Sequence, residues 1–290
     1  MKRALIAAGA LLLVAALAAC QDDLERQSRV SKLRVLAVRA EPAELVYDPA
    51  QPPPSTILTA LAVDKASGTP ITLRFALCTT LTDAPSPSLP CPGSGGIDLP
   101  DAGASAARLA LDDPRILAFA AAADGGFADA GAALAAGIPL LVGFTASATL
   151  PDGGPERLQG FDTVKLRTGG PSNVNPELHA LQLAEELDGG ALGTAVELAP
   201  ETTVRAAATY RLTPVAGTKD DPSKRYGFSF FATGGTISSL RSTDVTATGE
   251  PANIWVDWTA PADPGAVRFW VVLRDGRSGT AWLERSATVQ

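Results

Sequence analysis

The stretch that decides the fold is AVRFWVVLRDGRSGTAWLERSATV, residues 266–289. Every second residue of its first half is large and apolar: Val267, Phe269, Val271 and Leu273. Apolar residues return in its second half: Ala281, Leu283, Ala287 and Val289. Alternate side chains of a strand point to the same face of a sheet, and DGRSG, residues 275–279, is rich in turn residues. The stretch therefore predicts an antiparallel hairpin with one buried face.

Similar short strand patterns run along the rest of the chain. They are predicted at residues 33–38, 56–63, 71–78, 138–147, 161–168, 177–183, 194–199, 202–212, 225–235 and 252–260. Glycine, proline and aspartate separate them, a spacing typical of antiparallel sandwiches. In ITLRFALC, residues 71–78, the apolar residues alternate, and we expect this strand to form a hairpin with residues 56–63 around Gly68.

The clearest domain boundary is GGPSN, residues 169–173, which has turn residues and no charge. Predicted strands follow one another closely on either side of it. We therefore predict a mainly β protein with two antiparallel β-sandwich domains, residues 32–168 and 174–290.

The C-terminal hairpin also carries a family resemblance. VVLRDGRSG, residues 271–279, resembles the final hairpin of bacterial immunoglobulin-like and PKD-like domains, which has a V-x-V-x-D-x-x-G pattern. The resemblance covers roughly residues 200–290, and a weaker one runs from Leu33 through Phe75. It implies immunoglobulin-like sandwiches that serve adhesion, spacing or assembly, and it implies no catalytic residues.

The N-terminus has the layout of a secretory signal. Lys2 and Arg3 are followed by an apolar run, residues 4–16, and by small side chains before Cys20. The run is shorter than the roughly 20 apolar residues that a membrane-spanning helix needs. We therefore predict a signal peptide over residues 1–19.

LAAC, residues 17–20, resembles the lipobox of bacterial lipoproteins. The resemblance implies that Cys20 is acylated, that it becomes the N-terminus of the mature chain, and that residues 20–31 tether the fold to a membrane. Gln21 in the next position resembles the sorting signal for the outer membrane. The alternative is an ordinary secreted protein in which Cys20 is incidental.

The two other cysteines, Cys78 and Cys91, form an even pair in an exported chain, which favours a disulfide. A metal site is the alternative, but two thiols without a nearby histidine or a second pair rarely form one. We therefore expect a disulfide that closes the proline-rich segment 79–90.

Composition limits the class of partner. Cleavage before Cys20 removes Lys2 and Arg3 and changes the formal charge from −7 to −9, which disfavours nucleic acid. With 46% hydrophobic residues the chain can bury a core, and no second run approaches membrane-spanning length. We expect no cofactor.

Alanine dominates residues 101–137, where we expect a short helical insertion in the first domain. Asp113 and Pro114 suit the N-cap and the first helical position, and Gly125 suits the stop. Such an insertion either covers one end of a sheet or acts as a lid or docking arm.

All four tryptophans, Trp255, Trp258, Trp270 and Trp282, lie in the last 36 residues. Alternation separates Trp258, which shares a face with Ile254 and Val256, from the other three. Trp255, Trp270 and Trp282, with Arg268 and Arg274, are therefore a candidate binding face for a sugar ring or a protein partner. The alternative is that the tryptophans fill a small core and the arginine stems cover them.

Catalytic and metal signals are weak. The single histidine, His179, lies in a predicted strand without a motif, and paired carboxylates of a hydrolase cannot be recognised from spacing. The three Asp-Gly-Gly sequences, at Asp124, Asp152 and Asp188, fit tight turns better than calcium loops. We expect a non-catalytic, lipid-anchored envelope module that binds or scaffolds an envelope protein; a surface carbohydrate-binding module is the alternative, and a hydrolase a remote one.

Overall fold

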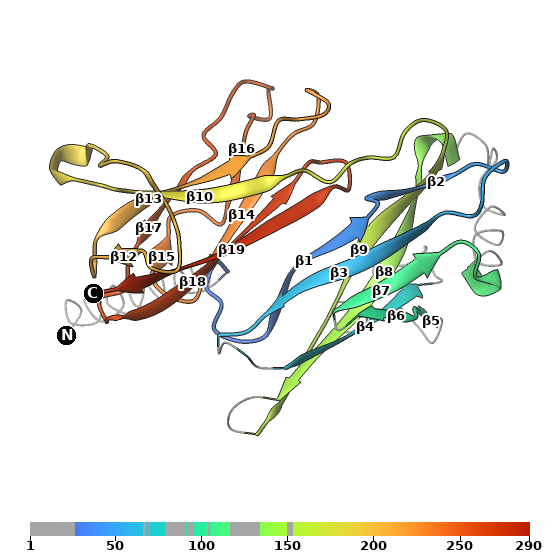
Figure 1. Ribbon diagram of the computed structural model, residues 1–290, viewed down its shortest axis with the longest axis horizontal. Coiled ribbons are helices and arrows are strands. Elements are labelled where there is room, and N and C mark those ends of the chain that lie inside the picture. Colours follow the sequence, from blue (N-terminus) through green and yellow to red (C-terminus); the bar gives the residue numbers. More distant parts are fainter. Residues whose placement is uncertain are drawn as a thin grey trace, which may run out of the picture.

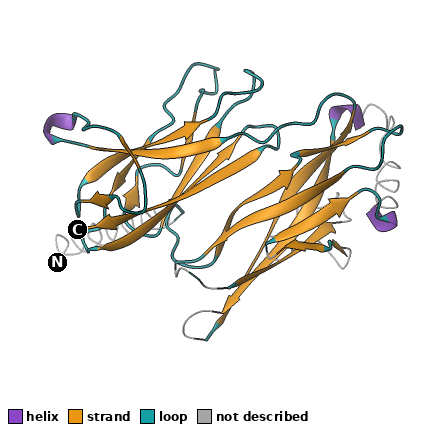
Figure 2. Cartoon of the chain, viewed as in Figure 1, coloured by secondary structure: helices purple, strands orange, loops and turns teal. Residues whose placement is uncertain are grey.

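The computed structural model describes residues 27–65, 68, 70–78, 91, 96–103, 105–116, 134–149 and 153–290. Its strands form four sheets, which pack in pairs as two β-sandwiches (Figures 1 and 2). The N-terminal sandwich is drawn in blue and green and the C-terminal one in yellow to red. The prediction of a mainly β protein with two antiparallel sandwiches is confirmed.

The first sandwich has a four-stranded and a five-stranded sheet. The four-stranded sheet has the order β1 (Arg34–Glu41), β3 (Ser55–Val63), β7 (Ala106–Ala110), β6 (Asp101–Gly103). The five-stranded sheet has the order β2 (Glu44–Tyr47), β9 (Pro155–Thr168), β8 (Ile138–Thr149), β4 (Ile71–Cys78), β5 (Gly96–Asp98).

The second sandwich has two five-stranded sheets. One has the order β11 (Val196–Glu197), β10 (Leu178–Glu185), β13 (Thr209–Ala216), β17 (Val256–Thr259), β15 (Thr236–Ile237). The other has the order β12 (Thr203–Val204), β19 (Thr280–Val289), β18 (Gly265–Arg274), β14 (Gly227–Ala232), β16 (Arg241–Thr243).

Both sandwiches have the same immunoglobulin-like strand order. In the first sandwich β1, β3 and β7 share one sheet, and β4, β8 and β9 share the other. In the second sandwich β10, β13 and β17 share one sheet, and β14, β18 and β19 share the other. In each, a short strand leaves the first sheet and pairs in parallel with the last strand, as β2 does with β9 and β12 with β19.

Each sandwich encloses its own core. The first core is aliphatic apart from Phe75 and Phe144, whereas the second is built around Trp258 and three phenylalanines. Trp258 packs edge-on against Phe269 with ring centroids 4.8 Å apart, and its indole N–H donates to the carbonyl of Gly234 at 3.0 Å. The predicted C-terminal hairpin is confirmed, because β18 and β19 pair from Gly265–Val289 to Arg274–Thr280.

Two local predictions are wrong. Residues 56–63 and 71–78 do not form a hairpin, since β3 pairs with β1 and β7 whereas β4 pairs with β5 and β8. The chain crosses between sheets at this point, so the two strands meet through their side chains. The helical insertion is also shorter than residues 101–137, because residues 101–110 include β6 and β7 and extend the sheet of β3.

Helical residues flank the remaining part of the insertion, at 114–116 and 134–136, and residues 117–133 lie outside the described ranges. The predicted cap is present: the Asp113 carboxylate accepts a hydrogen bond from the backbone N–H of Arg115 at 2.9 Å. Its side-chain hydrogen bond with Arg115 lowers the pKa of Asp113. Pro114 follows at the first helical position, where its missing N–H is not needed.

The predicted disulfide between Cys78 and Cys91 is confirmed, with Cα atoms 5.0 Å apart. Cys78, at the end of β4, is fully buried, and Cys91 is nearly so. The bond closes a loop at one end of the first sandwich.

We expect replacement of both cysteines by alanine to lower the free energy of unfolding by about 3 kcal/mol, because the bond restricts a loop of this size in the unfolded chain. Urea denaturation followed by circular dichroism measures the loss. Reduction of the wild type should produce the same loss in free energy of unfolding, and reduction of the double variant should produce none. A loss below about 1 kcal/mol would show that the disulfide does not stabilise the fold in this way.

Candidate functional site

The predicted tryptophan face lies where the two sandwiches meet. Trp270 and Trp282 point away from the core of their own sandwich, as the alternation predicts, but Trp270 is fully buried. The first sandwich covers it with the outer face of β1 and β3. The buried apolar residues of this contact are Val30, Leu36, Ala37, Leu61, Val63, Phe231, Trp270 and Val272, with Leu240 and Trp282 packed against them.

Arginines from both sandwiches line the same contact. Arg39 of β1 stacks over the Trp282 ring at 4.9 Å, and Arg268 of β18 lies 4.9 Å from the Trp270 ring centroid. Arg268 also donates to the backbone carbonyl of Lys65 at 2.9 Å, and Arg274 donates to that of Leu36 at 3.2 Å. The guanidinium groups predicted to bind a partner thus bind the other sandwich.

Trp255 lies elsewhere. It precedes β17 in the other sheet, and the guanidinium of Arg211 covers one face of its ring at 3.4 Å. Arg211 is held there by Asp257 at 3.3 Å. The expectation of one exposed face with Trp255, Trp270, Trp282, Arg268 and Arg274 is therefore wrong: the five residues are divided between two sheets, and Trp270 is covered.

The sequence contains a signal for this contact that alternation alone misses. Residues 269–273 of β18 are FWVVL, an uninterrupted apolar run, and all five are buried. A strand with one face in water would have polar residues at positions 270 and 272. Such a run indicates a strand that is covered on both faces.

The start of the described chain strengthens the contact. Ser28 and Val30 exchange backbone hydrogen bonds with Ala232 at the end of β14, at 2.9 and 2.8 Å. Residues 28–30, predicted as part of a tether, thus pair with the second sandwich before the chain enters the first. Cys20 lies outside the described residues.

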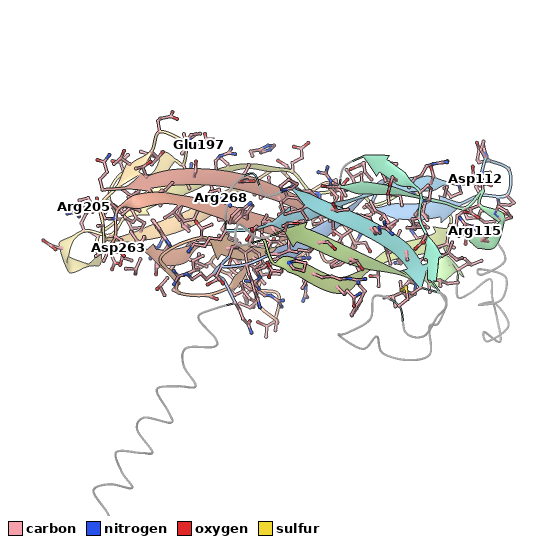
Figure 3. All side chains as sticks on the ribbon, turned by 90° about the horizontal axis from the view of Figure 1, so that it is seen from below. Asp112, Arg115, Glu197, Arg205, Asp263 and Arg268 are labelled. Carbon is pink, nitrogen blue, oxygen red and sulfur yellow. A yellow bond between two sulfur atoms is a disulfide. The ribbon has the colours of Figure 1, made fainter. Side chains whose placement is uncertain are left out.

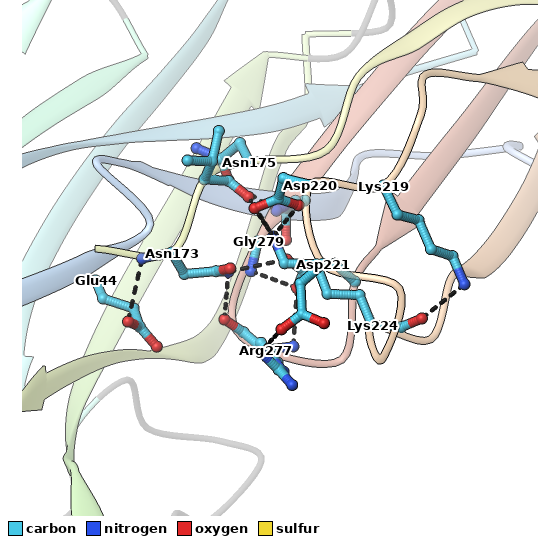
Figure 4. A network of polar contacts seen from close by, with 12 residues as sticks. Glu44, Asn173, Asn175, Lys219, Asp220, Asp221, Lys224, Arg277 and Gly279 are labelled. Atoms are coloured by element: carbon cyan, nitrogen blue, oxygen red, sulfur yellow. Dashed lines mark hydrogen bonds and ion pairs between the residues drawn. The ribbon is translucent and has the colours of Figure 1, made fainter. Parts of the chain in front are cut away.

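A polar network fixes the predicted boundary segment (Figure 4). The carboxylate of Asp275, fully buried, accepts hydrogen bonds from the backbone N–H groups of Arg277 and Gly279, both at 2.8 Å. It also accepts from the side-chain amide of Asn173 at 2.8 Å and pairs with the ammonium of Lys224 at 3.1 Å.

Lys224 is almost completely buried, but its ammonium has ionic and hydrogen-bond partners that offset the loss of water. Its ammonium also donates to the carbonyl of Val174 and pairs with Asp220, at 3.0 and 2.8 Å. Burial lowers the pKa of Lys224, but the hydrogen bonds with Asp220 and Asp275 raise it more, so the net shift is upward. Lys224 is therefore charged at neutral pH and ties the boundary segment to the turn after β18.

The first sandwich contributes the other half of the network. Glu44 of β2 accepts from Arg167 at 2.9 Å and from the backbone N–H of Asn173 at 3.2 Å. The side-chain amide of Asn175 donates to the carbonyl of Ala40 at 2.8 Å, and its oxygen accepts from the N–H of Thr280 at 2.8 Å. The boundary segment therefore bonds to both sandwiches and is not a loose linker.

Two cavities lie along this joint. A polar cleft of about 610 Å³ is lined by Lys165, Arg167, Asp220, Asp221, Lys224 and Arg277, among others. Most of these charges are paired within the cleft; Asp221, for example, pairs with Arg277 at 2.7 Å, and hydrogen bonds from Ser223 and Arg277 lower its pKa to about 2. Each of these ion pairs lies within one sandwich, and the charges do not converge on one point.

The second cavity, of about 180 Å³, lies between β9 and the turn after β18. It contains Asp162 and Arg274 from opposite sandwiches. Burial raises the pKa of Asp162 and lowers that of Arg274. Each shift reflects loss of water from a charged group, a consequence of the packing of the two sandwiches.

The other candidate residues are not brought together. His179 lies on β10, exposed, with the Glu177 carboxylate at 3.4 Å. Asp188 begins a 3₁₀ turn over Asp188–Gly190, and Asp124 and Asp152 lie outside the described residues. Within the described ranges, no three histidine, cysteine or acidic side chains gather as metal ligands, and no helix there is long and apolar enough to span a membrane.

No protein-family model matches the chain, and no curated protein matches it. Among solved structures, the D0-D1 domain of Intimin is similar at 11% sequence identity and a TM-score of 0.25, over 87% of this chain and 98% of that one. The immunoglobulin-like assignment rests on the strand order of the two sandwiches.

Proposed function

We propose that this protein is a lipid-anchored component of the bacterial cell envelope that acts as a non-catalytic binding or scaffolding module. The observation that carries the proposal is the joint between the sandwiches. Sandwiches in one chain move relative to each other unless their interface is extensive and apolar. Here an apolar cluster, the hydrogen bonds of the boundary segment to both sandwiches and residues 28–30 all hold them together.

Such a joint suits a scaffold, because a rigid unit presents its surfaces at a fixed distance from its anchor. If Cys20 carries the lipid, the seven residues that lead to Gln27 span at most about 25 Å. Residues 28–30 lie on the second sandwich. The second sandwich is then the part held near the bilayer, and the first extends from it.

The carbohydrate-binding alternative is less well supported. Stacking of a sugar needs an open aromatic face, but Trp270 is buried, Arg39 lies over Trp282 and Arg211 lies over Trp255. We therefore favour a protein partner over a surface polysaccharide, and within the envelope we favour the outer membrane because Gln21 follows Cys20.

The anchor is tested by Cys20→Ser in the native host. We expect the wild type to incorporate an alkyne-labelled fatty acid and to sediment with membranes. The variant should lose both properties and become soluble after export, because each methylene of an acyl chain buried in the bilayer contributes about 0.8 kcal/mol to membrane binding. Gln27→Ser, which keeps the cysteine, is the matched control. A Cys20→Ser chain that stays with the membranes and remains acylated would show that Cys20 is not the anchor.

The scaffold is tested by crosslinking in intact cells and mass spectrometry of the proteins that co-purify with each form. A specific protein that is lost with Cys20→Ser supports the scaffold. Retention of glycan alone, independent of the anchor, would favour the polysaccharide alternative.

A further inference from the structure

The loop between β10 and β11, residues 186–195, projects from the end of the second sandwich that is remote from the first (Figure 1). Glu197 and Arg205, which flank its base, lie at the opposite end of the molecule from Asp112 and Arg115 (Figure 3). The loop has internal order: the N–H of Leu187 donates to the carbonyl of Ala191 at 2.7 Å, and that of Gly193 to the carbonyl of Glu185 at 2.8 Å.

Large apolar side chains on this loop face solvent. Leu187, Leu192 and Val196, the last at the start of β11, are 46%, 41% and 49% exposed. They account for three of the five exposed large apolar side chains in the described part of the chain. None belongs to the core of the second sandwich, so the fold does not require them. Three exposed apolar side chains within ten residues of a projecting segment favour a contact surface.

Acidic groups border these side chains. Glu186 and Asp188, on either side of Leu187, are exposed, and neither pairs with a lysine or arginine within the described residues. At the base of the loop the carboxylates are paired instead, Glu185 with Arg205 and Glu197 with Arg285. Within the loop and its base, the unpaired negative charge is thus at the tip.

We infer that an apolar patch, formed by Leu187 and Leu192 of the loop and Val196 at its base, together with the acidic border at the tip, is a protein-docking site. The partner that fits it has an apolar socket bordered by lysine or arginine. An uncharged socket would remove water from Glu186 and Asp188 without compensation, and an anionic lipid surface would repel them. The inference rests on the proposed function and names the surface through which the module engages its partner.

The first experiment places the photo-crosslinker p-benzoylphenylalanine at position 192 of the full-length lipidated chain, and at the exposed position 248 of the same sandwich as the control. We expect ultraviolet light to give one protein adduct from position 192 and none from position 248. Adducts only with lipid, only with a second copy of this chain, or equally from both positions would overturn the inference.

The second experiment measures the affinity of the purified adduct protein for the lipidated chain. We expect Leu187→Ser/Leu192→Ser to weaken binding at least about tenfold, because the variant removes two large apolar side chains that the complex would bury. Glu186→Lys/Asp188→Lys should weaken it as well and remove its sensitivity to salt between about 0.05 and 0.5 M NaCl. Unchanged affinity in either variant would overturn the inference.

The experiments distinguish a wrong docking site from a wrong proposed function. Both loop variants alter exposed side chains, so circular dichroism should be unchanged and the chain should still sediment with membranes. If the loop variants keep the anchored complex intact, the docking site is wrong and the scaffold stands. If Cys20→Ser leaves membrane association and complex unchanged, the anchored scaffold itself is wrong.

Discussion

Replacement of Asp275 by alanine should lower the free energy of unfolding by about 3 kcal/mol, as loss of one partner of a buried ion pair does. The Asp275 carboxylate is fully buried and accepts hydrogen bonds from Asn173, Arg277 and Gly279. Without it the backbone N–H groups of Arg277 and Gly279 lose their acceptor, and the buried ammonium of Lys224 keeps only Asp220 as an ionic partner. Urea denaturation at neutral pH measures the loss.

Asp220→Ala is the matched control, because it removes the other carboxylate of Lys224 from a half-exposed position. Exposed pairs contribute roughly 0–1 kcal/mol, so we expect a loss below about 1 kcal/mol. The double variant Asp275→Asn/Lys224→Met should be less destabilised than the sum of its single variants, because neither charge remains unpaired. Equal losses for Asp275→Ala and Asp220→Ala would show that burial of the carboxylate is unimportant.

Replacement of Trp270 by alanine should lower the free energy of unfolding by about 3 kcal/mol, the lower end for a fully buried tryptophan, and should loosen the two sandwiches from each other. Trp270 belongs to the cluster between the sandwiches and not to the core of either one. Limited proteolysis should therefore cut the variant near the boundary, residues 169–177, before either sandwich unfolds. Small-angle scattering should report a larger radius of gyration.

Two other tryptophans serve as controls. Trp258→Ala removes a core side chain, so we expect a similar energetic loss without earlier cleavage at the boundary. Trp255→Ala removes a partly exposed ring, so we expect a loss below about 1 kcal/mol. Trp270→Phe should be milder than Trp270→Ala, because the indole N–H has no hydrogen-bond partner among the described residues. If Trp270→Ala behaves like Trp255→Ala, the contact does not hold the sandwiches together.

The local features of the fold could be predicted from the sequence. The alternation in residues 267–273 determined which side chains of β18 face the sandwich core, and Asp113 with Pro114 predicted a helix start that is present. The pair Cys78 and Cys91 predicted the disulfide. The strand alternation and the helix start depend only on residues close in sequence. The disulfide could be predicted because, with Cys20 assigned to the lipid, Cys78 and Cys91 have only each other as partners.

Several short strands were missed for a related reason. β2, β15 and β16 have two to four residues, too few to establish a period. β2 exists because β9 provides a parallel partner 121 residues further along the chain, from Glu44 to Lys165. The pairing comes from tertiary contact and leaves little local signal.

The candidate site was only half predictable. Sequence alternation correctly separated Trp258 from Trp270, and it correctly placed Arg268 and Arg274 on the Trp270 side of β18. It also singled out residues 169–173 as a break between strand patterns. It did not find the apolar patch formed by Leu187, Leu192 and Val196, because isolated apolar residues among glycines have no periodicity.

The sequence by itself determined strands, turns, the disulfide and which residues share a face. Only the tertiary structure decided that β3 and β4 belong to different sheets, that the first sandwich covers Trp270, and that the boundary segment is bonded to both sandwiches. The physical reason is range: side-chain direction along a strand follows from local backbone geometry, whereas what covers a face depends on contacts between residues as distant as Leu36 and Arg274.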